Sequence, residues 1–183
     1  MRPMILHIAL LGAFWALCRA TGEGAAPPSE PIQGAFGIAL GQPLDLSRAT
    51  AAGELEDGRV YARFVPDAPL APFTFYAALV TPESLRVYTV WAQARIRDPD
   101  VCEAEVERLA ARLEARYGPR DPQGPHARPA AVTITRGGRW AVVACDFDYP
   151  HSRLNLFVTD ELTRFLAEKE RLHIEGPPRG PPP

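Results

Sequence analysis

The hydrophobic pattern of this chain changes from strand period to helix period twice, in the same order each time. In the first half, three segments alternate with a period of about two and are rich in Val, Tyr, Phe and Trp: residues 59–65, 73–80 and 85–96. The next segment, residues 100–117, follows the helix period, with one apolar stripe made of Cys102, Val106, Leu109, Leu113 and Tyr117. An amphipathic helix needs an apolar surface to cover, and the preceding strands can supply it.

The same order of elements returns after a Pro-rich connection at residues 119–129. Strand patterns cover three more segments, residues 131–135, 139–147 and 153–159. A shorter helix is predicted over 160–172, with Leu162, Phe165 and Leu166 facing inward. Because short loops make neighbouring strands antiparallel, the pattern predicts an α+β fold: an antiparallel sheet built from two βββα-like units, with the helices packed on one face.

Residues 1–20 have the form of a secretory signal peptide. Arg2 supplies a short positive region, residues 4–17 are almost wholly apolar, and Ala20 stands at the cleavage position. The apolar run is shorter than the roughly 20 residues that a membrane-spanning helix needs. We therefore expect cleavage after Ala20 and a periplasmic or secreted protein, with no transmembrane segment in the mature chain. Lipid anchoring through Cys18 is the alternative localisation.

Outside the patterned region the composition is typical of flexible chain. Residues 21–33 are rich in Gly, Pro and Ala and are interpreted as a flexible leader. Residues 175–183, with five prolines among nine residues, are interpreted as a Pro-rich disordered tail. Residues 34–174 then form a single α+β domain, which is long enough to bury one core. Within it, residues 36–48 are ambiguous, and we expect a short strand followed by a helical turn.

The charge balance argues against several classes of function. The chain carries 20 basic and 22 acidic side chains, whereas nucleic-acid-binding domains usually have a concentrated basic surplus, so no nucleic-acid partner is expected. Lys169 is the only lysine, and no glycine-rich phosphate loop is present, which argues against Schiff-base and P-loop chemistry. No cofactor is expected.

Turn sequences predict how the strands pair, and the pairing decides which side chains share a face. A four-residue turn at 81–84 places Val80 opposite Leu85. Tyr76 is then opposite Thr89, so these two side chains lie on the same face of the sheet.

A second turn, the two glycines at 137–138, predicts a tight hairpin because both residues can adopt the positive φ that such turns require. Arg136 is then opposite Arg139. In this register Thr133 and Trp140 share the face opposite the more aliphatic one.

Together, these registers place large amphipathic rings among short hydrogen-bonding groups on one face of the sheet. The candidate binding residues on this face are Tyr76, Trp91, Trp140, Thr89, Thr133 and Gln93. Such a mixture is typical of recognition surfaces, so we predict that this face binds a partner or ligand. The alternative is that residues 36–48 fold over the face and bury it.

Two cysteines lie in the folded region. Cys102 is on the apolar stripe of the first helix, and Cys145 is on the aliphatic face of a strand. Because an exported chain folds in an oxidising compartment, these positions predict a Cys102–Cys145 disulfide. Two separately buried thiols are the alternative.

Asp146, Asp148 and His151 are three groups within six residues that could bind a metal or transfer protons. A metal site needs ligands that converge on one point. The turn that sets Asp148 opposite His151 also brings Asp146 opposite Arg153, so we favour a structural role and expect no metal or catalytic residue here. A small metal-dependent or acid-base hydrolase that uses this turn is the alternative function.

Four segments resemble uncharacterised exported bacterial proteins: FGIALGQPL at 36–44, VYARFVP at 60–66, FTFYAALVTPES at 73–84, and RYGP at 116–119, which ends the Cys-bearing helix. The resemblance implies export and this fold, and it implies no activity. We therefore predict an exported noncatalytic binding or interaction module of the bacterial cell envelope, whose partner is an envelope protein or ligand.

Overall fold

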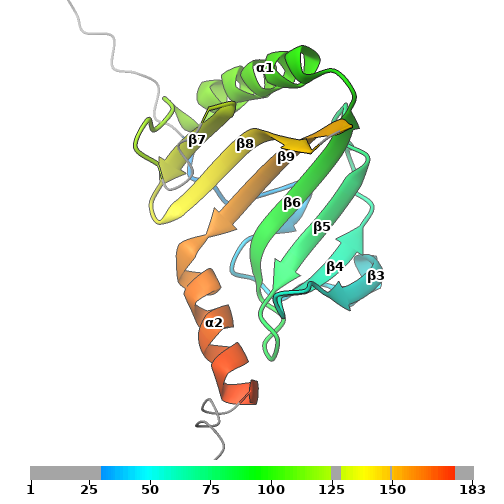
Figure 1. Cartoon of the computed structure of the whole chain (residues 1–183). Coiled ribbons are helices and arrows are strands. Elements are labelled where there is room, and N and C mark those ends of the chain that lie inside the picture. Colours follow the sequence, from blue (N-terminus) through cyan, green and yellow to red (C-terminus); the bar gives the residue numbers. More distant parts are fainter. Residues whose placement is uncertain (1–29, 125–128, 149, 176–183) are drawn as a thin grey trace, which may run out of the picture.

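The computed structural model describes residues 30–124, 129–148 and 150–175, and within them it confirms the α+β class (Figure 1). Seven antiparallel strands form one sheet, in the order β3 (Ala49–Glu54), β4 (Val60–Phe64), β5 (Phe75–Val80), β6 (Val87–Ile96), β9 (His151–Asp160), β8 (Arg139–Asp148) and β7 (Ala131–Arg136). The other elements are helices α1 (Pro99–Tyr117) and α2 (Glu161–Glu175), a ribbon of β1 (Gly34–Ala35) and β2 (Ile38–Ala39), and the 3₁₀ turn η1 (Leu46–Arg48). The expected signal peptide, the leader up to residue 29 and the tail from residue 176 lie outside the described residues.

The central strand pair joins the two halves of the chain. Strands β3 to β6 follow one another as hairpins, but β6 then pairs with β9, from Thr89 opposite Thr159 to Ile96 opposite Ser152. Strands β7, β8 and β9 form the second meander. The six predicted strands are all present. The additional strand β3 has the sequence ATAAGE, which contains no large apolar residue that would reveal it.

Helix α1 begins and ends at the capping residues that the sequence offers. The side chain of Asp98 accepts a hydrogen bond from the Asp100 N–H at 2.9 Å, and Pro99 occupies the first turn. Gly118 follows the helix with φ 93°, a conformation that favours glycine. The apolar stripe that these caps delimit is buried: Cys102, Val106, Leu109, Ala110 and Tyr117.

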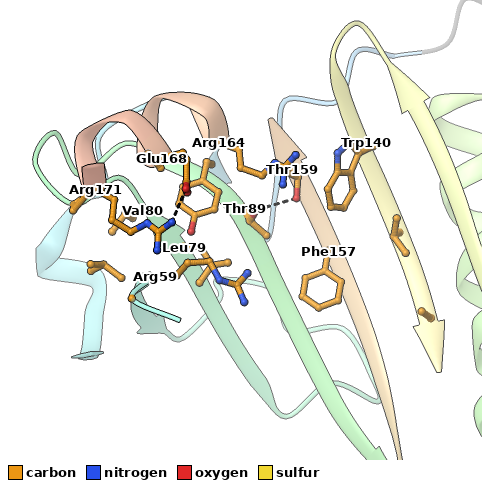
Figure 2. Close-up of a pocket in the computed structure, with 17 residues that line it drawn as sticks. Arg59, Leu79, Val80, Thr89, Trp140, Phe157, Thr159, Arg164, Glu168 and Arg171 are labelled. Carbon is orange, nitrogen blue, oxygen red and sulfur yellow. Dashed lines mark hydrogen bonds and ion pairs between the residues drawn. The ribbon is translucent and has the colours of Figure 1, made fainter. Parts of the chain in front are cut away.

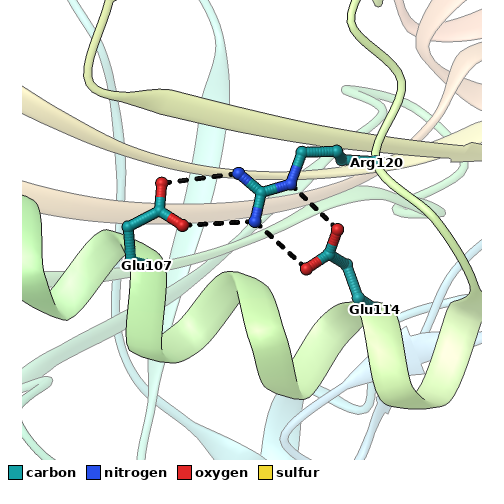
Figure 3. Close-up of polar contacts among 3 residues, drawn as sticks. All are labelled: Glu107, Glu114 and Arg120. Atoms are coloured by element: carbon teal, nitrogen blue, oxygen red, sulfur yellow. Dashed lines mark hydrogen bonds and ion pairs between the residues drawn. The ribbon is translucent and has the colours of Figure 1, made fainter.

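An arginine just beyond α1 fixes the chain that leaves the helix. Figure 3 shows the Arg120 guanidinium between Glu107 and Glu114, with Nε 2.9 Å from Glu114 and Nη2 3.2 Å from Glu107. The next residue, Asp121, donates its N–H to the carbonyl of Thr133 at 2.7 Å. The connection after α1 is therefore held against the outer strand β7.

One face of the sheet carries the main core. Helix α1 packs there over β7, β8 and β9, and the Cys102–Cys145 disulfide, with a Cα–Cα distance of 6.1 Å, joins it to β8. Residues 30–48 cover the rest of this face, and four of their side chains are buried in the same cluster: Ile32, Ile38, Leu40 and Leu44. This segment thus does not cover the face that bears the tryptophans. Residues 30–33, which the sequence reading assigned to the leader, belong to the folded part.

Helix α2 borders the opposite face, which corrects the prediction that both helices pack on one face. It follows β9 without a loop (Figure 1). Its residues Ala167 and Arg171 line a pocket on that face. The sheet side of the pocket is formed by Trp140, Val142 and Phe157, which belong to a cluster apart from the main core. Because the helix leaves the sheet at the end of β9, its starting point is set by that strand and not by the α1 layer.

The apolar residues at the start of α2 face outward, contrary to the prediction. Leu162, Phe165 and Leu166 are 80%, 59% and 38% exposed. The side turned toward the protein carries Thr163, which is buried, and Ala167. Neither α1 nor α2, as described, is long and apolar enough to cross a membrane.

The register of the β5–β6 hairpin differs from the prediction by three residues, because Tyr76 is opposite Ala92 and not Thr89. A longer connection causes the shift. The Thr81 hydroxyl accepts a hydrogen bond from the Arg86 N–H at 2.9 Å, and a bulge at the end of the hairpin adds one further residue. Since an odd shift exchanges the two faces of a strand, Tyr76 moves to the main core. The glycine hairpin at 137–138 has the predicted register, with Arg136 opposite Arg139.

We expect the disulfide to be a major source of stability. It links residues separated by 43 positions, so replacing both cysteines with alanine should lower the free energy of unfolding by about 4 kcal/mol on the chain-entropy estimate. Urea unfolding of the oxidised, reduced and double-alanine proteins measures this. The double-alanine protein should be insensitive to reductant. Two alkylatable thiols in wild-type protein purified without reductant would contradict the prediction.

Candidate binding site

The face opposite the main core carries five of the six predicted binding residues. Thr89, Trp91 and Gln93 alternate along β6, and cross-strand pairing continues their rows through β9 into β8 and β7. The first row runs from Thr89 to Trp140, and the second runs from Trp91 to Thr133. We call this the tryptophan face.

Tyr76 does not belong to the tryptophan face. It is 6% exposed in the main core, where its ring contacts Phe36 at 5.0 Å and Phe73 at 6.4 Å between centroids. Its hydroxyl accepts a hydrogen bond from the Leu70 N–H at 3.0 Å. These contacts give Tyr76 a structural role, and Phe75 takes its place beside Trp91, with a centroid distance of 4.8 Å.

A buried asparagine organises one end of the tryptophan face. The side-chain oxygen of Asn155 accepts hydrogen bonds from Trp91 Nε1 at 3.0 Å and from Gln93 Nε2 at 2.9 Å. Its amide nitrogen donates to Asp146 Oδ2 at 2.7 Å. Asn155 is 2% exposed, so these bonds satisfy a buried amide and fix the orientation of the indole. Sequence reasoning missed this residue, although its position opposite Gln93 follows once β6 is paired with β9.

The tryptophan face and helix α2 enclose a pocket of 310 Å³ (Figure 2). Its wall is mainly apolar and includes Leu79, Val142, Ala144 and Phe157. Trp140 closes the end near the start of α2, where its indole N–H donates to the carboxylate of Glu161. The strands therefore supply a preformed apolar wall, and the helix supplies the opposite side.

Two threonines place hydroxyl groups in this wall. The Oγ1 atoms of Thr89 and Thr159 are 2.9 Å apart, and Figure 2 shows their contact between two neighbouring strands. Whichever hydroxyl donates in this contact, the other keeps a hydrogen for a second bond. The pair thus adds a hydrogen-bond donor to an otherwise apolar surface.

The rim of the pocket carries arginines that are each paired with a carboxylate. Arg59 lies 2.7 Å from Asp57, Arg164 lies 2.8 Å from Glu161, and Arg171 lies 2.5 Å from Glu168. These arginine side chains are 51%, 59% and 32% exposed, so the pairs contribute little to stability on their own. They do hold the guanidinium groups at the pocket opening.

Tyr88 is the ionisable ring within the pocket. Burial raises the pKa of its hydroxyl to about 12, so the group is neutral near pH 7.

Polar contacts fix α2 at two points along its length. At its start, Asp160 accepts hydrogen bonds from the Thr163 N–H at 3.0 Å and from Arg139 Nε at 2.7 Å. Burial raises the pKa of Asp160, but these hydrogen bonds outweigh burial and hold the pKa below its ordinary value of 3.8. Farther along, Glu170 accepts hydrogen bonds from the Ser84 hydroxyl at 2.6 Å and from the Glu83 N–H at 2.8 Å. The wall that α2 contributes is therefore tied to the sheet at two points.

The turn with Asp146, Asp148 and His151 is organised by strand pairing. Asp148 is opposite His151 and Asp146 is opposite Arg153, as predicted. Asp146 receives the amide of Asn155, and His151 is exposed. Within the described residues, no group of three His, Cys, Asp or Glu side chains could hold a metal ion. The side chain of Asp148 is outside the described part.

The chain matches no protein-family model, and it has no significant match among curated proteins or solved structures.

We expect Asn155 to be important for stability. Replacing it with alanine leaves the Trp91 and Gln93 donors without their acceptor and should cost about 2 kcal/mol. Urea unfolding measures the cost, and red-shifted tryptophan emission should accompany it. Gln93→Ala is the matched control, because it removes one partly exposed donor and should cost less than about 1 kcal/mol. Equal stability of Asn155→Ala and wild type would refute this role.

We also expect Asp160 to make the stability depend on pH. Its pKa is lower in the folded than in the unfolded chain, so its contribution is present above the unfolded value and is lost as the pH falls through the folded one. Asp160→Asn should therefore be less stable by about 1 kcal/mol at pH 7. The difference in the free energy of unfolding between wild type and Asp160→Asn should become smaller as the pH falls below 3.8. Urea unfolding from pH 7 to pH 2.5 tests this, with Asp100→Asn as control, and a difference independent of pH would contradict it.

Proposed function

We propose that this chain is an exported noncatalytic binding module whose pocket between α2 and the tryptophan face takes a small ligand with an apolar body. The observation that carries the proposal is the preformed 310 Å³ pocket, with an apolar wall and a few fixed polar groups. Ligand sites in proteins typically have this composition and a volume of about 300 to 1,000 Å³. The ligand would lie against Phe157 and Trp140 and would be covered by α2.

The chemistry of the lining supports binding without catalysis. The residues that line the pocket include no Cys, His, Ser or Lys. Nucleophilic catalysis needs a nucleophile with an adjacent base, whereas Thr89 and Thr159 contact each other. The single carboxylate of the lining, Glu168, is paired with Arg171 at 2.5 Å.

Two observations support export. The sequence of residues 1–20 has the pattern of a secretory signal, and Cys102 and Cys145 stand at disulfide distance. Disulfides persist in oxidising compartments. We therefore place the mature module in the periplasm or outside the cell, where its ligand would come from the envelope.

We expect the purified mature protein to bind N-phenyl-1-naphthylamine, a neutral aromatic probe whose fluorescence rises in apolar surroundings. Ala167 lies on the pocket side of α2, so Ala167→Phe should fill the space and lower the affinity at least tenfold. Ala111→Phe, at an exposed position of α1, is the matched control and should leave binding unchanged. Fluorescence titration measures both affinities.

Two outcomes would reject the proposal. The probe fails to bind the folded wild-type protein, or Ala167→Phe binds it as tightly as wild type does. The second outcome would place the probe elsewhere, for example on the exposed Leu162 and Phe165 side chains.

A further inference from the structure

The lining of the pocket carries more cationic than anionic side chains. Three arginines and one glutamate line it, although the chain as a whole carries more acidic than basic side chains. Tyr88, which is neutral near pH 7, adds a hydroxyl donor. The pair of Thr89 and Thr159 adds another, because one of its hydrogens is not used between the two oxygens.

Two of the arginines are held by their carboxylates along one edge only. Arg59 contacts Asp57 through Nε and Nη2, both at 2.7 Å. Arg164 contacts Glu161 through Nε at 2.9 Å and Nη2 at 2.8 Å. Within the described residues, the Nη1 atoms of both side chains have no hydrogen-bond partner. Each carboxylate therefore orients a guanidinium whose second edge can receive another oxygen.

The two arginines come from different sides of the pocket. Arg59 stands beside β4, and Arg164 belongs to the first turns of α2. Figure 2 shows Arg164 extending toward Thr159 and Trp140, while Arg59 extends into the space between Leu79 and Phe157. Each guanidinium thus lies on the same side of the pocket as one of the two apolar rings, Trp140 or Phe157.

We infer that the ligand of this pocket is an amphipathic anion, with an apolar body against Phe157 and Trp140 and an acidic head that Arg59 and Arg164 bind. This inference rests on the binding function proposed above and names the class of ligand. Guanidinium groups favour carboxylate and phosphate heads because their planar edge matches two oxygens. A neutral apolar molecule would leave these donors to water and would gain nothing from their placement.

A pair of probes with related rings tests the inference. 8-Anilino-1-naphthalenesulfonate carries a sulfonate on the ring system of N-phenyl-1-naphthylamine. We expect Arg59→Gln/Arg164→Gln to bind the sulfonate probe about tenfold more weakly, as loss of charged hydrogen bonds implies, and the neutral probe within twofold of wild type. Arg112→Gln, on an exposed part of α1, is the control and should change neither affinity. Raising the salt concentration should weaken only the sulfonate probe, because the arginines are at the surface.

The exposed carboxylate of Asp57 needs a separate control, since removing Arg59 leaves it unpaired. Asp57→Asn/Arg59→Gln removes both charges and should still bind the sulfonate probe more weakly than wild type. Affinity equal to wild type in this variant would show that repulsion by Asp57 caused the loss, and it would overturn the inference.

Competition by short amphiphiles identifies the head group. Octanoate and octyl phosphate should displace the sulfonate probe, whereas 1-octanol should do so at least tenfold less well. Displacement by only one of the two anions supports the inference and assigns the acidic head as carboxylate or phosphate. Equal displacement by 1-octanol, or equal effects of the double arginine variant on both probes, would overturn it.

The two proposals can fail separately. If the neutral probe binds and Ala167→Phe blocks it, the binding function stands whatever the arginine variants show. If neither probe binds wild type, the binding function fails and the inference fails with it.

Discussion

The pairing of β6 with β9 is the constraint on which the rest of the structure depends. These strands come from different halves of the chain, and their hydrogen bonds turn two separate meanders into one sheet. The same register sets Thr89 beside Thr159, Trp91 beside Phe157 and Gln93 beside Asn155. A displacement by one residue would send each of these side chains to the opposite face. The core and the candidate site therefore depend on one set of backbone bonds.

The two faces of this sheet are stabilised in different ways. On one, α1 and residues 30–48 form a continuous apolar layer that a disulfide fastens to β8. The other has a helix at one end only, and its rings are fixed by hydrogen bonds and stacking, such as the 5.8 Å stack of Trp91 on Phe157. This second arrangement leaves space beside the rings, which a fully packed layer would fill.

The sequence-based predictions were correct where an interaction is local in the sequence, and they failed where it joins residues that are distant in the sequence. The glycine turn at 137–138 and the turn between β8 and β9 have the predicted registers, because a short connection determines the pairing of its own strands. The 81–86 connection was predicted wrongly. Its conformation depends on the hydroxyl of Thr81 and on the carboxylate of Glu170, which is distant in sequence. That single error moved Tyr76 to the wrong face.

The aromatic residues of the candidate site were predictable from the sequence, but the helix that encloses the pocket was not placed correctly. Trp91 and Trp140 follow from strand alternation, and the Cys102–Cys145 pair follows from the two apolar stripes. The pocket also needs α2. The apolar residues of this helix were predicted to face inward, but they face outward. That helix is positioned by Asp160, Glu170 and other polar side chains, and hydrophobic periodicity contains no information about such contacts.

The way α2 is attached has a consequence for how the protein responds to its surroundings. The layer under α1 is held mainly by buried apolar side chains and by the disulfide. The contacts of Glu170 with Ser84 and of Arg171 with the Asp57 carbonyl lie at the surface, where water and ions compete for the same groups. Helix α2 is therefore held in part by contacts that solvent can also make. Since this helix covers the pocket, the same surface contacts that hold it also keep the tryptophan face covered.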